Sequence, residues 1–256
     1  CLASGSGALE FVESRFDGEP GIDRLGGVTD LQALADGDGA GPLPGLLAAA
    51  SVLDNSLSLF ARDAGDGRLT PAIRVAQGDT LGSVTIDSLA GARALAATAD
   101  GRDVYVASRE SDAVTGFRIS DAGGGVPGLS RIAVERGRVG LDQATHLLLS
   151  PDERFLYVAG ANDDAVAVFA RDLVTGTLTW VESEQNGIND PGDAGAAVAG
   201  LDGVEHLAIS PDGAHLYTFA GGAGTIARFD RDTATGRLNW REVRSGGDGE
   251  RALDHA

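Results

Sequence analysis

The sequence lacks methionine and lysine, and it holds one cysteine, Cys1, and few aromatic residues. A single cysteine excludes a disulfide bond within the chain. No stretch approaches 18 consecutive apolar residues, so we expect no transmembrane segment. Because no initiator methionine is present, we expect the chain to be a processed form or a piece of a longer protein.

Positive charge is also scarce. The 38 acidic residues outnumber the 20 basic ones, which are all arginine, and the net charge is −18. Carboxylates repel phosphate groups, so the composition argues against a nucleic-acid partner. Two explanations of the acidity stay open: the codon usage of a GC-rich genome and adaptation to high salt.

The cysteine at the first position raises the hypothesis of a lipid anchor at Cys1, as in bacterial lipoproteins. The residue that follows is Leu2, where such proteins usually have a small residue, and no flexible tether comes after it. We therefore keep lipidation of Cys1 as one of two alternatives, and we expect an extracytoplasmic location: periplasmic, cell-surface or secreted.

What the chain has in abundance is glycine and an internal repeat. The stretch SPDERFLYVAGANDDAVAVFARDLVTGTLTWVES (150–183) returns sixty residues later as SPDGAHLYTFAGGAGTIARFDRDTATGRLNWREV (210–243). A repeat of this length indicates stacked units of one supersecondary structure. Two anchors recur in the same order along the chain: an aromatic Phe60, Phe117, Phe169 and Phe229, and a tyrosine Tyr105, Tyr157 and Tyr217.

Each repeat predicts four antiparallel strands. Alternating and β-branched runs such as FLYVAG, AVAVFARD and TLTWVE are separated by turn residues. Stretch 41–53 resembles a helix start after Pro44, but it aligns with the second strand of the later repeats, so we expect a strand there. Such four-stranded repeats are typical of propeller blades.

The fold prediction is an all-β propeller of four-stranded antiparallel blades in a single domain, residues 1–256. We place blades at about 25–77, 88–135, 139–185 and 200–244, with partial blades at 1–14 and 245–256. Two arrangements stay open: a fragment of a longer propeller, and a closed ring of four or five blades.

At these residues the chain resembles the lactonase-like β-propellers, the group of 6-phosphogluconolactonase-type and YVTN-repeat proteins. The resemblance is carried by 149–182 and 209–232, and it covers 85–244 well. It implies a usually seven-bladed fold with a central channel, and lactone hydrolysis as one family activity. The shared motifs are turn and core residues, so the resemblance assigns no catalytic residue.

Two histidines are the candidate channel residues. His146 and His206 stand at the same place in adjacent repeats, before an apolar run predicted as the innermost strand. Two imidazoles beside a channel could bind a metal or move a proton. The alternative is that this position favours a polar residue at the strand end and was inherited by repeat duplication. The preceding repeat has Ala94 at the same place.

The acidic turns suggest calcium, but DGDG at 36–39 fails the EF-hand pattern and NDD at 162–164 fits a hairpin turn. We predict no cofactor, with calcium as the alternative, and no metal site. Loop 185–200 is the longest connection and carries Asn186, Asn189 and Asp190, which we predict as recognition residues.

The sequence leaves open whether the protein is an enzyme. Our main prediction is a non-catalytic extracytoplasmic scaffold or recognition module that binds a protein partner or ligand within a larger chain or assembly. The alternative is a lactone hydrolase of the 6-phosphogluconolactonase type acting in the central channel.

Overall fold

The computed structural model describes residues 13–19, 24–34, 45–122, 126–189 and 197–246. In these residues the chain forms strands and no helix, and therefore no helix that could cross a membrane. The strands are β1 (Val28–Ala33), β2 (Leu46–Ser51), β3 (Ser56–Arg62), β4 (Leu69–Ala76), β5 (Thr80–Leu81), β6 (Val84–Thr85), β7 (Ala92–Ala97), β8 (Asp103–Ser108), β9 (Ala113–Asp121), β10 (Pro127–Arg136), β11 (Ala144–Leu149), β12 (Phe155–Gly160), β13 (Ala165–Arg171), β14 (Leu178–Gln185), β15 (Val204–Ile209), β16 (His215–Ala220), β17 (Thr225–Arg231) and β18 (Leu238–Ser245).

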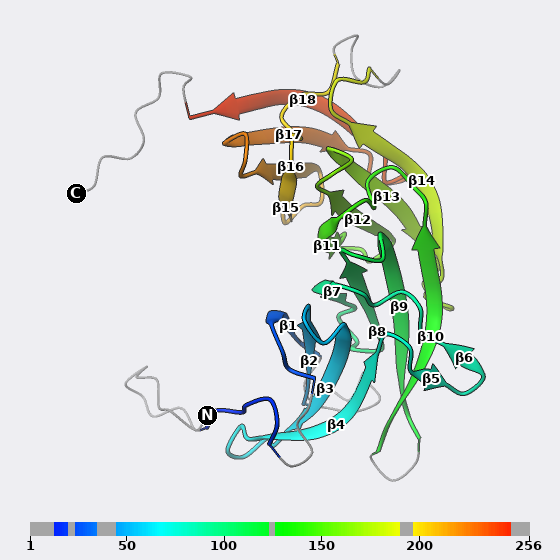
Figure 1. Cartoon of the computed structure of the whole chain (residues 1–256). Coiled ribbons are helices and arrows are strands. Elements are labelled where there is room, and N and C mark those ends of the chain that lie inside the picture. The colour runs from blue at the N-terminus through cyan, green and yellow to red at the C-terminus, as the bar shows by residue number, and fades with distance from the viewer. Residues whose placement is uncertain (1–12, 20–23, 35–44, 123–125, 190–196, 247–256) are drawn as a thin grey trace, which may run out of the picture.

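Sixteen of the strands form four-stranded antiparallel meanders, β1–β4, β7–β10, β11–β14 and β15–β18, and β5 and β6 form a small hairpin. Figure 1 shows the four sheets side by side in an open arc, with β1, β7, β11 and β15 on its concave side. These innermost strands contact one another in that order. The predicted all-β fold of four-stranded antiparallel sheets is confirmed.

The partial blades and the total number of blades stay predictions, because residues 1–12 and 247–256 lie outside the described part. One contact bears on the N-terminal side. The Glu13 carboxylate accepts a hydrogen bond from the Leu69 backbone N–H, as the Glu182 carboxylate accepts one from the Leu238 N–H in the last sheet. Glu13 therefore contacts β4 of the first sheet in the same way as Glu182, on the outer strand β14 of the third sheet, contacts β18 of the fourth sheet.

The hydrophobic core lies between the sheets. Three clusters fill the three gaps between consecutive sheets, and they are built mainly of Leu, Val and Ala with one to three buried aromatic residues each. Small residues let the sheets pack closely, which explains why so few aromatics suffice. Stretch 41–53 supplies β2, so the expected strand is confirmed, whereas residues 36–39 lie outside the described part.

The acidic turn at 162–164 ties neighbouring sheets together. The Asp163 carboxylate accepts hydrogen bonds from the Gly140 N–H at 2.7 Å and the Asp142 N–H at 3.1 Å, and the Asp164 carboxylate accepts one from the Gly203 N–H at 2.7 Å. These oxygens satisfy backbone donors of the loops that enter β11 and β15. The turn role predicted for NDD is therefore supported.

A buried polar group, which we call the latch, joins the second and third sheets. The Tyr105 hydroxyl donates to the Gly176 carbonyl at 2.7 Å and accepts from Arg171 Nε at 2.8 Å. A second nitrogen of Arg171 lies 2.6 Å from the fully buried Asp103 carboxylate, which Arg118 also binds. Gly176 has a φ of +71°, and a Cβ there would lie 2.5 Å from Asp103 Oδ2, so glycine is required.

The third and fourth sheets carry a second latch of the same design. The Tyr157 hydroxyl donates to the Gly236 carbonyl at 2.8 Å and accepts from Arg231 Nε at 2.5 Å. Its carboxylate is weaker, because Asp152 lies 3.5 Å from Arg231 and is partly exposed. Asp172, which follows the first latch arginine, instead closes the next turn by accepting from the Val174 and Thr175 N–H groups.

Candidate functional site

The structure brings the two candidate histidines together on the concave side. His146 lies on β11 and His206 on β15, and their ring centroids are 5.3 Å apart in an edge-to-face arrangement. The His206 ring also stacks with Phe219 of β16 at 6.4 Å. His146 is half-buried, whereas His206 is exposed.

A β-bulge at the same place in each innermost strand positions these side chains. In the pairing with the second strand of its sheet, each innermost strand has one extra residue, and the four extra residues are Thr29, Arg93, Thr145 and Glu205. The residues that follow the bulges are Asp30, Ala94, His146 and His206. Bulges redirect side chains and are frequent beside functional sites.

The bulge residues and their neighbours line one pocket. It has a volume of about 270 Å³ and is lined by Thr29, Asp30, Arg93, Ala94, Thr145, His146 and His206. The lining comes from all four innermost strands, so the pocket exists only because the sheets stack as an arc. We call it the channel-side pocket.

Hydrogen bonds between innermost strands hold its walls. The Thr29 hydroxyl donates to the Arg93 carbonyl at 2.6 Å, and the Thr145 hydroxyl donates to the Val204 carbonyl at 3.2 Å. The Asp30 carboxylate accepts from the Leu95 N–H at 2.7 Å. The side chains that make these hydrogen bonds stabilise the strand packing. The side chains that remain available to contact a ligand are Arg93, His146 and His206.

Burial lowers the pKa of His146 below the usual histidine range, and the neighbouring His206 lowers it further, while Asp30 opposes both. Its Nδ1 is buried without a hydrogen-bond partner among the described residues. A neutral imidazole at pH 7 can accept a proton. Arg93 is half-buried and adds positive charge to the lining.

The described residues contain no group of three or more His, Cys, Asp or Glu side chains placed to hold a metal ion. A catalytic zinc site commonly takes three protein ligands, and the histidine pair offers two. The arrangement therefore fits proton transfer better than metal binding. The expectations of no cofactor and of calcium as the alternative stay predictions.

The predicted recognition residues lie elsewhere. The Asn186 side-chain oxygen accepts a hydrogen bond from the Leu201 N–H at 3.3 Å, and the backbone N–H of Asn186 donates to the Asp164 carbonyl, so Asn186 anchors the loop. Asn189 is exposed. Asp190 and Cys1 lie outside the described residues, so their predicted roles stay predictions.

Sequence reasoning missed Arg93, Asp30 and the bulge. The signal was in the repeat alignment: the position before the histidine is polar in every repeat, as Thr29, Arg93, Thr145 and Glu205. A polar residue that recurs at one place in a buried strand breaks the alternation of apolar and polar side chains. A β-bulge at that place accounts for the break.

Comparison with known proteins assigns the family. The family model described as lactonase, 7-bladed β-propeller matches residues 49–194, which is more than half of the chain. A search of curated proteins gives no significant match.

Several solved structures share the fold at low sequence identity. A candidate 6-phosphogluconolactonase of Bacteroides fragilis matches with a TM-score of 0.62 and 23% identity over 85% of this chain and 55% of its own. A Lactobacillus plantarum protein gives 0.61 and 24%, covering 85% and 57%. The periplasmic gluconolactonase of Pseudomonas aeruginosa gives 0.57 and 22%, covering 78% and 54%. The chain thus spans little more than half the length of these structures.

Proposed function

Because the chain belongs to the family of seven-bladed β-propeller lactonases, we propose that it hydrolyses lactones of sugar acids in the channel-side pocket. The observation that carries the proposal is the neutral, half-buried His146 beside Arg93 in one pocket on the concave side. The lactone ring is an uncharged cyclic ester, so the acidic surface repels a plain sugar lactone less than its 6-phosphate. Gluconolactonase and 6-phosphogluconolactonase names among the similar structures support this substrate class.

Opening a lactone needs a base for water and a donor for the carbonyl oxygen. We assign the base to His146, which accepts a proton as the water oxygen attacks the carbonyl carbon. Arg93 donates to the carbonyl oxygen, where negative charge develops. The bond from that carbon to the ring oxygen then breaks, and the His146 imidazolium returns its proton to the ring oxygen. The product is a hydroxy acid whose carboxylate pairs with Arg93.

His206 is the positioning residue in this scheme. Its edge-to-face contact with His146 limits rotation of the base, and its proximity helps keep His146 neutral. Because two protonated imidazoles at this distance would repel each other, His206 favours the proton-accepting form of His146.

The family and the similar structures support this function over the non-catalytic scaffold that the sequence first suggested. An extracytoplasmic location remains part of the proposal, supported by the likeness to a periplasmic gluconolactonase. A protein partner and a lipid anchor at Cys1 stay predictions of the sequence.

The test is ring opening by the purified protein, followed as acid release at constant pH. The substrates are glucono-δ-lactone, its 6-phosphate and dihydrocoumarin, each corrected for spontaneous hydrolysis. We expect turnover of a sugar lactone. A lack of activity on all three substrates would reject the proposed lactone hydrolysis and favour the non-catalytic scaffold.

Substitutions locate the activity. We expect His146→Asn to lower kcat by about 10²–10⁴-fold, the usual contribution of a general base. Arg109→Gln is the matched control, because Arg109 binds Gln143 in a loop away from the channel-side pocket. Full activity in His146→Asn would overturn the assignment of the base.

A further inference from the structure

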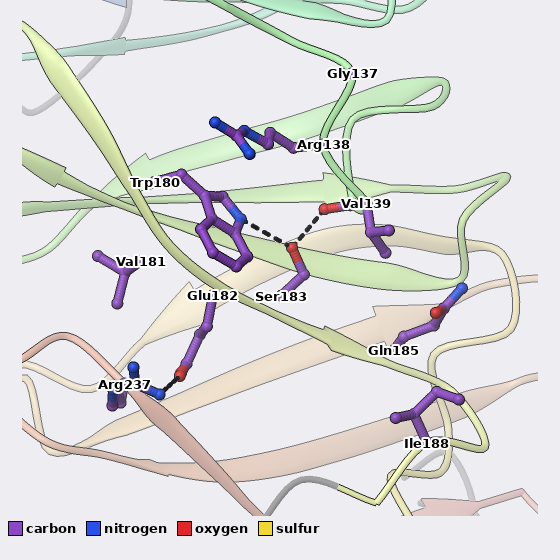
Figure 2. Close-up of a pocket in the computed structure, with 10 residues that line it drawn as sticks. All are labelled: Gly137, Arg138, Val139, Trp180, Val181, Glu182, Ser183, Gln185, Ile188 and Arg237. Carbon is purple, nitrogen blue, oxygen red and sulfur yellow. Dashed lines mark hydrogen bonds and ion pairs between the residues drawn. The ribbon is translucent and has the colours of Figure 1, made fainter.

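An open groove lies on the outer rim of the third sheet. It runs between β14 and the connection that enters β11, with a volume of about 550 Å³ (Figure 2). Trp180 is 42% exposed there, and Val139 and Ile188 are exposed beside it. Exposed apolar side chains that converge on one groove indicate a binding site more than scattered ones do.

The fourth sheet shows what normally covers this tryptophan. Trp180 pairs with Phe169, and Trp240 pairs with Phe229 at the same place. The Trp240 indole N–H donates to the Ala199 carbonyl at 3.0 Å, and the ring packs against the core. The Trp180 indole nitrogen lies 3.4 Å from the Ser183 hydroxyl, and the residue is far more exposed than the core aromatic residues.

The connection itself differs in a way that adds a charge. Val198, two residues before Gly200, is buried in the core, whereas the residue two before Gly140 is Arg138. The Arg138 guanidinium lies over the Trp180 ring at 5.3 Å from its centroid (Figure 2). Replacing a core valine by arginine turns a packing position into a cation beside an open aromatic face.

Arg138 also differs from the other arginine of the groove. Arg237 is held by the Glu182 carboxylate at 2.6 Å, whereas Arg138 makes no such direct ion pair among the described residues and interacts with the Glu135 carboxylate only through its charge. The Arg138 guanidinium is therefore not tied by a direct ion pair to a carboxylate of the part of the chain that the structure describes. Its N–H groups are placed to receive a carboxylate from outside.

Polar side chains complete the groove. The Gln185 side-chain nitrogen donates to the Asp163 carbonyl at 3.1 Å, which orients the amide and turns its oxygen into a fixed acceptor. Glu182 and Arg237 close the other end. An aromatic face flanked by planar hydrogen-bonding groups suits a ring that has both an apolar face and hydroxyls.

We propose that this groove binds a pyranose sugar acid, such as a uronate. The C–H face of the ring packs on the Trp180 indole, the carboxylate pairs with Arg138, and a hydroxyl bonds to the Gln185 amide oxygen. One arginine suits one carboxylate, and the acidic surface disfavours polyanions and acidic peptides. The site goes beyond the proposed hydrolysis and does not depend on it.

The test is titration of the purified chain with methyl β-D-glucuronide, followed by saturation-transfer NMR and by tryptophan fluorescence. Methyl β-D-glucoside, which lacks the carboxylate, and benzoate, which lacks the sugar, are the matched probes. We expect the glucuronide to bind about tenfold more tightly than the glucoside, a typical effect of one charge-assisted pair. Equal binding of the two sugars, or binding of benzoate alone, would overturn the ligand class.

Variants place the ligand. Arg138→Gln should remove the preference for the glucuronide, and Trp180→Ala should abolish binding of both sugars. Arg244→Gln, at an exposed arginine of β18, is the control and should change neither. His146→Asn should bind the glucuronide normally, which separates this site from the channel-side pocket. Unchanged binding in Trp180→Ala would reject the groove, and urea unfolding confirms that each variant folds.

Discussion

The first interface between sheets is built differently from the second and third. Tyr105 and Tyr157 stand three residues before the end of the second strand of their sheets, and Ala48 holds that place in the first sheet. Arg171 and Arg231 stand six residues into the third strand, and Ile119 holds that place in the second sheet. The first interface thus lacks both halves of the latch.

The two halves change together for a physical reason. Ala48 and Ile119 belong to one apolar cluster, in which neither a hydroxyl nor a guanidinium needs a partner. A tyrosine or an arginine alone in that gap would be a buried polar group without its hydrogen bond, which costs stability. An interface of this repeat is therefore stable with the complete latch or with none.

Alkaline pH should break the latched interfaces and spare the apolar one. Burial raises the pKa of Tyr105 and of Tyr157 to about 12, from the ordinary value of 10. Their contribution is complete below pH 10 and is lost as the pH rises through 12. The loss by pH 12 should be about 2 kcal/mol per tyrosine, from 1.4 kcal/mol per pKa unit. Urea unfolding between pH 9 and pH 12 measures it.

The control is the double variant Tyr105→Phe with Tyr157→Phe, which removes both latch hydroxyls and keeps the third tyrosine, Tyr217. We expect it to start less stable and to lose much less stability above pH 10. An equally steep loss in the double variant would show that the latch tyrosines are not the titrating groups.

Removing one half of a latch should have the next largest effect. Arg171→Leu leaves the fully buried Asp103 with Arg118 alone and the Tyr105 hydroxyl without its donor. We expect a loss of about 3 kcal/mol in the free energy of unfolding, as for other broken buried pairs. Arg231→Leu should cost less, because Asp152 is distant and partly exposed. Equal costs at the two arginines would contradict the role given to the carboxylate.

The apolar interface should give the smallest effect. Ile119→Val removes one methylene from the first gap and should cost about 1 kcal/mol. The cost should not change between pH 7 and pH 11, since no titrating group faces Ile119 in its cluster. A pH-dependent cost, measured by the same urea unfolding, would show that the first interface also holds a polar group.

Much of this fold could be predicted from the sequence. The recurrence of Phe60, Phe117, Phe169 and Phe229 located the four sheets, because each of these side chains is buried at the same register of a third strand. Strand alternation and turn residues then defined the meanders. Even β2, whose stretch resembles a helix start, followed from its place in the repeat.

The site was less predictable. The alignment found His146 and His206, but it could not show that they touch, since they lie sixty residues apart and meet only when β11 and β15 pack together. Arg93 was missed because a bulge shifts it out of the alternating pattern. The Trp180 groove could not be predicted either. It forms because the connection that enters β11 leaves part of the Trp180 side chain exposed.

The pH dependence of glucono-δ-lactone hydrolysis, compared between the unmodified chain and His146→Asn, tests the central claim most directly. Because burial lowers the pKa of His146 below the ordinary histidine value of 6.5, the fall of kcat with decreasing pH should have its midpoint below pH 6.5. The variant should lose both the rate and the fall. A rate no faster than spontaneous hydrolysis, or an unchanged profile in His146→Asn, would contradict hydrolysis in the channel-side pocket.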